Sequence, residues 1–284
     1  MLPPIDWPNR QFSRSVSSEG LLWHVQIVGK GPALLCLHGT GASSHSFAPL
    51  SQHLRRRFTL VIPDLPGHGF TESLEQHETT LEHIADRLSA LLAKLELRPS
   101  LLIGHSAGAA IAAHMALTSQ PQVSEVIAIN GAFKPFGAAA ATLFSGMARW
   151  LARSRALPAV TALHGFFEKP VKNLIHETGS RSSPEMLRCY QQLLRRRNHI
   201  KGTLRLMGGW DLNALLQSLP TLACPLTLIS CSNDQTVPPQ QARELHEQLP
   251  NSRLVELPDL GHLGHEEHPE QFSELIEKPS DRQK

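Results

Sequence analysis

Three residues have the types and the chain order needed for nucleophilic attack on an acyl carbon: Ser106, Asp234 and His262. A serine hydroxyl becomes a nucleophile when a base takes its proton, and that base works best when an acid orients it. We therefore interpret Ser106 as the nucleophile and His262 as the base that later returns the proton to the leaving group. Asp234 would hold the imidazole tautomer and stabilise its positive form.

Ser106 lies in the sequence Gly104-His105-Ser106-Ala107-Gly108, which fits the G-x-S-x-G pattern of a sharp turn between a strand and a helix. Such a turn holds its serine in a positive-φ conformation, which surrounding structure must enforce. Gly104 and Gly108 are expected because side chains at these positions would collide across the turn. The pattern is a weak signal by itself, but an apolar run precedes it and small helix-forming residues follow it, as the turn requires.

An oxyanion formed during acyl transfer needs two backbone N–H donors. We assign one to Ala107, which would begin the helix after Ser106 and lie at its electropositive end. The second is assigned to Thr40, in the loop His38-Gly39-Thr40-Gly41 that follows a short apolar run. Gly39 and Gly41 would let this backbone come close to the serine.

The remaining chain shows short apolar runs that alternate with helical patterns. Strands are predicted at 21–28, 33–37, 58–63, 126–129, 225–230 and 254–257, with one more before Ser106; helices are predicted at 43–57, from a Thr79 cap with Glu82 as its capping-box partner, after Ser106, at 239–248 and at 269–277. Residues 1–15 look irregular. This alternation predicts an α/β fold, a mostly parallel central sheet with helices on both faces.

Each proposed triad residue has a plainer interpretation when taken alone. Asp234 could cap the helix that follows it, and His262 is one of 16 histidines. Their placement favours the catalytic interpretation, because both follow predicted strands and would lie at the carboxyl edge of a parallel sheet, where such sheets bind ligands.

Residues 134–205 interrupt the alternation, since they show several helical stretches and no strand pattern. They contain 13 Lys and Arg against 3 acidic residues, a net charge of +10, whereas the whole chain carries only +2 and the remaining residues therefore −8. We predict a helical, basic lid at 134–205, inserted after the strand that follows the Ser106 helix, and a core made of 1–133 and 206–284.

The densest positive charge in this lid is Arg195-Arg196-Arg197. These arginines are either solvated helix faces or contacts for a carboxylate-bearing ligand, an acidic partner or an anionic membrane surface. The apolar side chains Met147, Trp150, Leu151, Phe166 and Phe167 could form a wall for a flat ligand or pack within the lid.

Composition narrows the class of protein further. A net charge of +2 gives no reason to expect nucleic-acid binding, and no run approaches the roughly 20 apolar residues of a membrane span. Four cysteines without a C-x-x-C pair favour reduced thiols in a cytoplasmic protein. The histidine-rich run at 262–268 lacks the H-E-x-x-H spacing of a zinc site, so we expect neither a metal nor another cofactor.

Together these motifs resemble the α/β-hydrolase family over roughly residues 20–276. A closer resemblance, to the BchO family of magnesium-chelatase accessory proteins of bacteriochlorophyll biosynthesis, is carried by HGTGASSHSF (38–47), DLPGHGFT (64–71), GHSAGAAI (104–111), ING (129–131), GWDL (209–212), NDQTVPP (233–239) and LGHLGHEEHP (260–269). That resemblance implies a role alongside magnesium insertion into protoporphyrin in a photosynthetic bacterium. It also implies a porphyrin ligand and magnesium chelatase subunits as partners, and porphyrin propionates would suit the basic lid.

Three functional hypotheses remain open at this point. The first is a serine hydrolase that cleaves an ester or related acyl bond in tetrapyrrole metabolism. The second is a general carboxylesterase or C–C bond hydrolase without a pigment role. The third is a non-enzymatic accessory protein that binds porphyrin for the chelatase. Serine at position 106 disfavours haloalkane and epoxide hydrolysis, for which related enzymes carry aspartate at this place.

Overall fold

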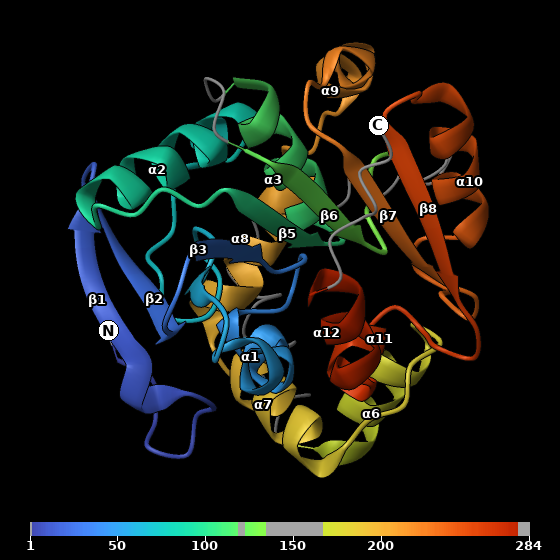
Figure 1. The fold of residues 1–284 in the computed structure, drawn as a ribbon. Helices are drawn as coiled ribbons and strands as arrows, with labels where there is room; N and C mark the ends of the chain where they lie inside the picture. Colours follow the sequence, from blue (N-terminus) through green and yellow to red (C-terminus); the bar gives the residue numbers. More distant parts are fainter. Residues whose placement is uncertain (1, 119–122, 135–166, 278–284) are drawn as a thin grey trace.

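The computed structural model describes residues 2–118, 123–134 and 167–277. Its strands form one sheet of eight in the order β1-β2-β4-β3-β5-β6-β7-β8 (Figure 1). Their bounds are β1 Ser13–Ser18, β2 Leu21–Gly29, β3 Ala33–Leu37, β4 Thr59–Pro63, β5 Leu101–His105, β6 Glu125–Ile129, β7 Leu226–Cys231 and β8 Ser252–Leu257. β2 pairs antiparallel with both β1 and β4, and the pairs from β4 through β8 are parallel.

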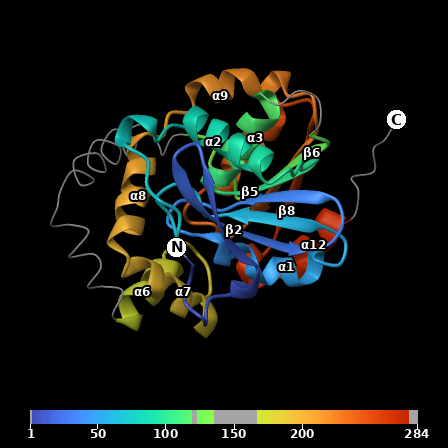
Figure 2. The same cartoon turned by 90° about the vertical axis from the view of Figure 1, so that its left-hand side faces the viewer.

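Helices cover both faces of this sheet (Figure 2). The face with α1 Ala48–Leu54 also carries α12 Pro269–Glu277, and the opposite face carries α2 Leu81–Lys94, α3 Ala107–Thr118, α9 Asn213–Ser218 and α10 Pro239–Gln248. Shorter helical turns are η1 Arg10–Phe12, η2 Ser44–Phe47, η3 Gln76–Glu78, η4 Leu219–Thr221 and α11 Gly264–Glu267. The predicted α/β class, with a mostly parallel sheet between two helical layers, is confirmed.

The central strands are apolar throughout because each of their faces meets a helical layer. In β3, Leu35 and Leu37 pack into the core on the α2 and α3 side, whereas Leu34 and Cys36 pack on the α1 and α12 side. This alternation is the two-residue period of a strand. The same burial on both faces fixes the strand register and therefore the positions of the loops at the strand ends.

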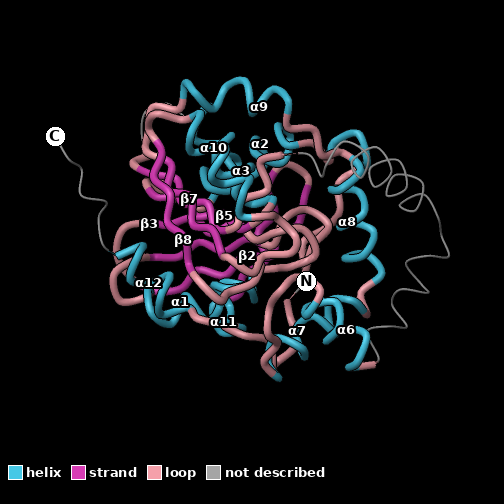
Figure 3. Tube along the Cα trace, turned by 90° about the vertical axis from the view of Figure 1, so that its right-hand side faces the viewer, coloured by secondary structure: helices cyan, strands magenta, loops and turns pink. Residues whose placement is uncertain are grey.

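Three further helices lie at the carboxyl end of the parallel strands: α6 Glu168–His176, α7 Pro184–Leu194 and α8 Arg197–Gly208 (Figures 2 and 3). They belong to the segment predicted as a lid, and α8 continues three residues past the expected boundary at 205. Residues 135–166, with Met147, Trp150, Leu151 and Phe166, lie outside the described residues, so that part of the lid stays a prediction. Within the described residues, no helix has the length and apolarity that crossing a membrane requires.

Two local predictions were wrong near the N-terminus. The last three residues of the region predicted as irregular, 13–15, begin β1, whose alternation of Ser and Arg with a single Val fits an edge strand that pairs only with β2. The helix predicted at 43–57 begins only at Ala48, because Pro49 has no N–H to donate and is accommodated in the first turn of a helix.

The capping prediction for α2 was wrong by one residue. The hydroxyl of Thr80, not of Thr79, accepts the His83 N–H at 3.3 Å and caps the helix. The Thr79 hydroxyl instead donates to the Glu75 carbonyl at 2.8 Å. Thr79 and Thr80 have the same side chain, so the sequence does not distinguish them as caps. The backbone direction after the η3 turn determines which hydroxyl reaches the first turn of α2.

Candidate active site

Ser106 stands at the turn between β5 and α3 with φ of 52°. Its N–H donates to the Ile129 carbonyl at 3.0 Å, and its own carbonyl accepts the Ala132 N–H at 3.0 Å. These bonds to the end of β6 hold the serine in a conformation that most residues avoid. The strained conformation of Ser106 is therefore maintained by contacts between β5 and β6 as well as by the turn itself.

Close backbone approach explains the glycines around this turn. A Cβ on Gly104 would lie 2.3 Å from Ala109, and a Cβ on Gly108 would lie 2.1 Å from the Leu37 carbonyl oxygen. A Cβ on Gly39 would lie 2.8 Å from the Cβ of Ser106. The last contact brings the loop after β3 directly against the serine.

Asp234 and His262 come together from the loops after β7 and β8. The Nδ1 of His262 lies 2.7 Å from Oδ2 of Asp234, and both side chains are buried. The other Asp234 oxygen accepts the N–H groups of Thr236 and Val237 at 2.7 and 2.8 Å, which fixes the carboxylate. With Nδ1 facing the carboxylate, Nε2 of His262 is the nitrogen left for proton exchange.

Ser106 and His262 line the same cavity of about 520 Å³. The hydrogen bonds of the described residues do not include one between the serine hydroxyl and the imidazole. Such bonds often tighten only when a substrate is bound, and a rotation about the serine Cα–Cβ bond changes the distance between the two groups.

The two N–H groups assigned to an oxyanion belong to the loop after β3 and to the first residue of α3. Thr40 lines the same cavity, and Ala107 begins α3 as the residue after Ser106. The hydrogen bonds of the described residues leave both N–H groups without an acceptor. Gly41, which follows Thr40, has φ of 80° and lines the cavity as well.

The wall of the cavity facing the sheet edge is largely apolar. It consists of Leu174 and Ile175 of α6, Tyr190 and Leu194 of α7, Ile200, Leu204 and Met207 of α8, and Leu263 after the proposed catalytic histidine. These side chains would surround an apolar acyl or alcohol group, with the polar groups confined to the serine end.

The arginines proposed to hold an anionic ligand are not among the residues that line this cavity. Arg195 and Arg197 are exposed, and the Arg196 Nε donates to the Gly69 carbonyl at 3.1 Å. The Arg196 guanidinium also lies 4.3 Å from the Phe70 ring centre. Arg196 thus fastens α8 to the loop after β4, and a role of the three arginines toward a ligand stays a prediction.

Two residues that the sequence did not single out hold the backbone of His262. The Asn130 amide donates to the Gly261 and His262 carbonyls at 3.2 and 2.9 Å, and its oxygen accepts the Cys231 N–H at 2.8 Å. The His105 Nε2 donates to the His262 carbonyl at 2.9 Å. Asn130 has φ of 45° at the end of β6, a conformation in which asparagine is enriched, so Asn-Gly after a strand was the signal available.

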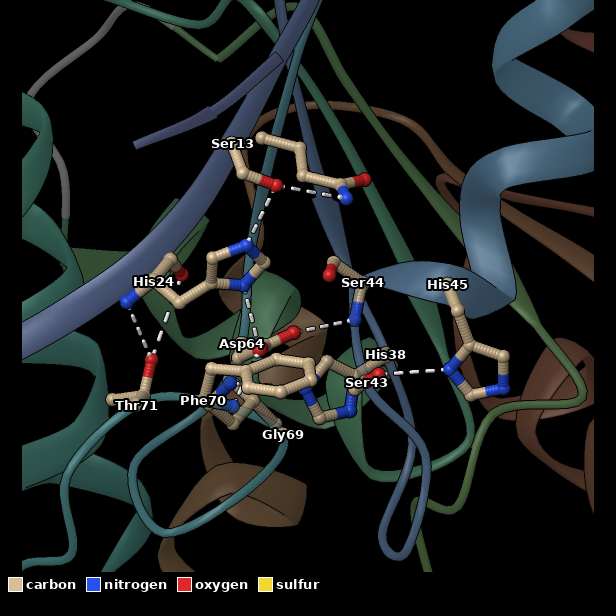
Figure 4. A network of polar contacts seen from close by, with 12 residues as sticks. Ser13, His24, His38, Ser43, Ser44, His45, Asp64, Gly69, Phe70 and Thr71 are labelled. Atoms are coloured by element: carbon tan, nitrogen blue, oxygen red, sulfur yellow. Dashed lines mark hydrogen bonds and ion pairs between the residues drawn. The ribbon is translucent and has the colours of Figure 1, made fainter. Parts of the chain in front are cut away.

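A second serine, histidine and aspartate come together from β1, β2 and the loop after β4 (Figure 4). The Nδ1 of His24 lies 2.7 Å from Asp64 Oδ2, and its Nε2 lies 2.9 Å from the Ser13 hydroxyl. Asp64 also accepts the Ser44 and Phe70 N–H groups at 2.6 and 2.8 Å. Burial alone would raise the pKa of this carboxyl, but His24, His38 and the Ser44 N–H outweigh it and hold the pKa below its usual range.

The histidine-rich run at 262–268 is divided among separate partners. His262 contacts Asp234, the His265 Nε2 lies 2.8 Å from the Ser46 hydroxyl, and His268 lies 3.1 Å from Glu270. In the part of the chain that the structure describes, no group of three or more His, Cys, Asp or Glu is arranged to hold a metal ion.

Comparison with known proteins places this fold and sequence in a family. Residues 32–269 match the family model described as the alpha/beta hydrolase fold. The chain therefore belongs to the α/β-hydrolase family. An alpha/beta hydrolase fold protein from Burkholderia ambifaria superposes with a TM-score of 0.78 at 20% identity, covering 94% of this chain and 97% of that one.

Sequence relatives refine this placement. The magnesium-chelatase 30 kDa subunit of Rhodobacter capsulatus is 34% identical over 275 residues, covering 96% of each chain. A pimeloyl-[acyl-carrier protein] methyl ester esterase of Chromobacterium violaceum is 27% identical and covers 87% of this chain and 94% of that protein. The first relative confirms the resemblance to the chelatase-associated group that the sequence motifs indicated.

Proposed function

We propose that this protein is a serine hydrolase that cleaves an ester or related acyl bond with Ser106, His262 and Asp234. The observation that carries the proposal is a strained serine on a cavity that it shares with an imidazole held by a buried carboxylate at 2.7 Å. Membership of the α/β-hydrolase family supports it, as does similarity to an esterase.

In this mechanism the Ser106 oxygen attacks the carbonyl carbon while the imidazole Nε2 of His262 takes the hydroxyl proton. Asp234 stabilises the resulting imidazolium through Nδ1. The carbonyl oxygen gains a negative charge and accepts the N–H groups of Thr40 and Ala107. The tetrahedral carbon then expels the alcohol, which receives the proton from His262. Water attacks the acyl-serine by the same route, releasing the acid and restoring the serine.

We further propose that the reaction, or the cavity that hosts it, serves magnesium chelation in bacteriochlorophyll synthesis. The support is the 34% identity to the magnesium-chelatase 30 kDa subunit over nearly the whole chain. The apolar cavity wall suits a hydrophobic ligand such as a porphyrin, and Arg195, Arg196 and Arg197 are candidates for its propionates. In this setting the protein would work in the cytoplasm, with chelatase subunits as partners and with peripheral contact to a membrane.

The catalytic part of the proposal is tested with a fluorophosphonate probe and a p-nitrophenyl ester. Wild type should be labelled at Ser106 and should hydrolyse the ester, and Ser106→Ala should do neither. Labelling that persists in Ser106→Ala, or its absence in wild type, would rule out this nucleophile.

The pigment part is tested by titrating wild type and Ser106→Ala with protoporphyrin and its magnesium form, followed by mass spectrometry of the pigment. Binding with a mass change in wild type alone supports a tetrapyrrole hydrolase. Binding without a mass change in either protein favours a non-enzymatic accessory role. No binding would leave a carboxylesterase or C–C bond hydrolase without a pigment role. Replacement of the three arginines together by alanine should weaken binding, and unchanged affinity would remove them from the site.

A further inference from the structure

His199 on α8 makes two hydrogen bonds that a neutral imidazole alone can make. It is almost fully buried, with 2% of its surface exposed. The Gly69 N–H donates to Nδ1 at 3.0 Å, and Nε2 lies 3.1 Å from the Gly41 carbonyl oxygen. An N–H can only donate and a carbonyl can only accept, so Nδ1 carries the lone pair and Nε2 the hydrogen.

The Gly41 carbonyl belongs to the loop that carries the Thr40 N–H. Because a peptide unit is planar and trans, its C=O and N–H point in opposite directions. The bond from His199 to the Gly41 oxygen therefore orients the Ala42 N–H, which donates to the Gly39 oxygen at 3.2 Å. The Gly39 oxygen, which also accepts a hydrogen bond from the His38 Nδ1 at 2.8 Å, in turn orients the Thr40 N–H, which belongs to the same peptide unit. Two peptide planes thus connect the imidazole of His199 to the Thr40 N–H.

Close packing of α8 against the loop after β4 fixes the position of His199. A Cβ on Gly202 would lie 2.2 Å from the Gly67 oxygen, so the helix backbone touches the loop after β4. Arg196, one residue before α8, donates to the Gly69 carbonyl at 3.1 Å. His199 therefore stands between two loops, one bearing Gly69 and the other bearing Gly41.

We infer that His199 is a positioning residue, through which α8 holds the Thr40 N–H in the direction that an oxyanion requires. The inference rests on the proposed function. It gives the helical segment a part in the chemistry beyond covering the cavity, although His199 lies 93 residues from Ser106 in the chain.

The protonation state of His199 agrees with this role. Burial, together with the nearby His68 and His38, lowers the pKa of His199 well below its usual value, whereas the Gly41 carbonyl and Asp64 act in the opposite direction. A second proton would sit on Nδ1, so that two N–H donors would face each other and the hydrogen bond from Gly69 would be lost. The arrangement therefore stays neutral at ordinary pH.

Two substitutions separate the contacts of the ring. In His199→Asn the amide oxygen can take the place of Nδ1 and accept from Gly69, but nothing donates to Gly41. In His199→Gln the amide nitrogen can take the place of Nε2 and keep that donor. Loss of one oxyanion donor costs about 10²- to 10³-fold in kcat, so an indirect loss of alignment should cost about tenfold.

We expect His199→Asn to lower kcat on a p-nitrophenyl ester about tenfold with KM changed less than about twofold. His199→Gln should keep kcat within about threefold of wild type while having a similar melting temperature to His199→Asn. The exposed neighbour Asn198→Ala serves as a matched control on α8 and should match wild type. Equal kcat in the Asn and Gln variants, or a change confined to KM or to the melting temperature, would overturn the positioning role.

Fluorophosphonate labelling of wild type separates the two proposals. If wild type and His199→Gln are labelled quickly and His199→Asn slowly, the positioning role is supported, because the bound phosphonate oxygen takes the place of the oxyanion. If all three are labelled equally, the positioning role fails while the serine nucleophile stands. If wild type is not labelled at all, both the proposed function and the positioning role of His199 are refuted.

Discussion

Two groups of serine, histidine and aspartate stand out among the described residues, and their histidine–aspartate hydrogen bonds are the same length. His262 lies 2.7 Å from Asp234 near Ser106, and His24 lies 2.7 Å from Asp64 beside Ser13. In the second group the serine hydroxyl even contacts the imidazole, at 2.9 Å. Judged by these distances alone, the group around Ser13 is the more complete triad.

The surroundings reverse that judgement. Ser106 is held at φ of 52° before a helix N-terminus, beside N–H groups without an acceptor and on a cavity of about 520 Å³. Ser13 lies in an ordinary edge strand, does not line that cavity, and receives a weak hydrogen bond from the Gln26 amide at 3.4 Å. The comparison teaches that a nucleophile is defined by strain, access and oxyanion donors as much as by its triad partners.

Removing each serine in turn should give the largest difference between the two groups. Ser106→Ala should lower kcat on a p-nitrophenyl ester on the order of 10⁶-fold, as loss of a nucleophile does. Ser13→Ala should keep kcat within about twofold, because Ser13 does not line the cavity that Ser106 and His262 share. Steady-state kinetics of the two purified variants decide the matter, and a comparable loss in Ser13→Ala would contradict our assignment.

Replacing Asp234 should change kcat, whereas replacing Asp64 should change the unfolding free energy. Asp234→Asn should lower kcat about 10⁴-fold with little change in folding, since the amide favours the wrong imidazole tautomer. Circular dichroism and kinetics on the same sample test this. Normal turnover in Asp234→Asn would exclude it as the orienting acid.

Asp64→Asn should act on stability instead. The amide has one acceptor oxygen where the carboxylate has two, so the buried Ser44 or Phe70 N–H loses its acceptor, which costs about 3 kcal/mol of unfolding free energy. Urea denaturation measures this loss, while kcat of the folded variant should fall less than about tenfold. A strong loss of kcat without a loss of stability would instead place the Asp64 group in the reaction.

Stability should also depend on pH, because Glu266 and Asp64 are buried carboxyls whose pKa values shift in opposite directions on folding. Burial raises the pKa of Glu266 to about 7, although hydrogen bonds from Ser46 and Tyr190 oppose the rise. The folded protein thus binds a proton at Glu266 that the unfolded chain releases near pH 4.5, so Glu266 alone lowers the unfolding free energy between about pH 4.5 and 7, on the order of 3 kcal/mol. Buried histidines such as His38 and His265, whose pKa is lowered to about 3, contribute with the opposite sign, so the Glu266 contribution is the difference between wild type and Glu266→Gln. In urea titrations at several pH values, Glu266→Gln should gain stability relative to wild type as pH rises from about 4.5 to 7, and a difference that does not change with pH would refute the assignment.

Asp64 has the opposite sign. Its pKa is lowered on folding, so its stabilisation is complete above the unfolded pKa of about 4 and is lost only as pH falls through the folded value. The Glu266 experiment therefore lies in a pH range where Asp64 contributes no slope.

The smallest expected effect is the stability of Ser13→Ala. The hydroxyl contacts His24 and Gln26 on an edge strand, so its removal should cost about 1 kcal/mol. Urea denaturation measures this value. A loss several times larger would mean that the Ser13 contact also holds the buried His24 and Asp64 side chains in place.

Sequence alone predicted the layered α/β fold, because a strand buried on both faces leaves a continuous apolar run and a surface helix leaves a period of 3.6 residues. It also predicted the turn at Ser106, since a positive-φ serine between close-packed backbones requires glycine at fixed neighbouring positions. The positions of α10 and α12 agreed with the predicted ranges, as their first turns contain proline. These features share one property, which is that their cause lies within a few residues of chain.

Tertiary structure alone decided the contacts between distant segments. Ser13 meets His24 because β1 pairs with β2 in one register, and the polar residues of an edge strand do not specify that register. His199 reaches Gly41 across 158 residues of sequence, and Asn130 reaches His262 across 132. Hydrogen bonds between such distant residues depend on the positions of whole helices and loops in the folded protein. The packing of the entire core fixes those positions, and no local residue pattern encodes them.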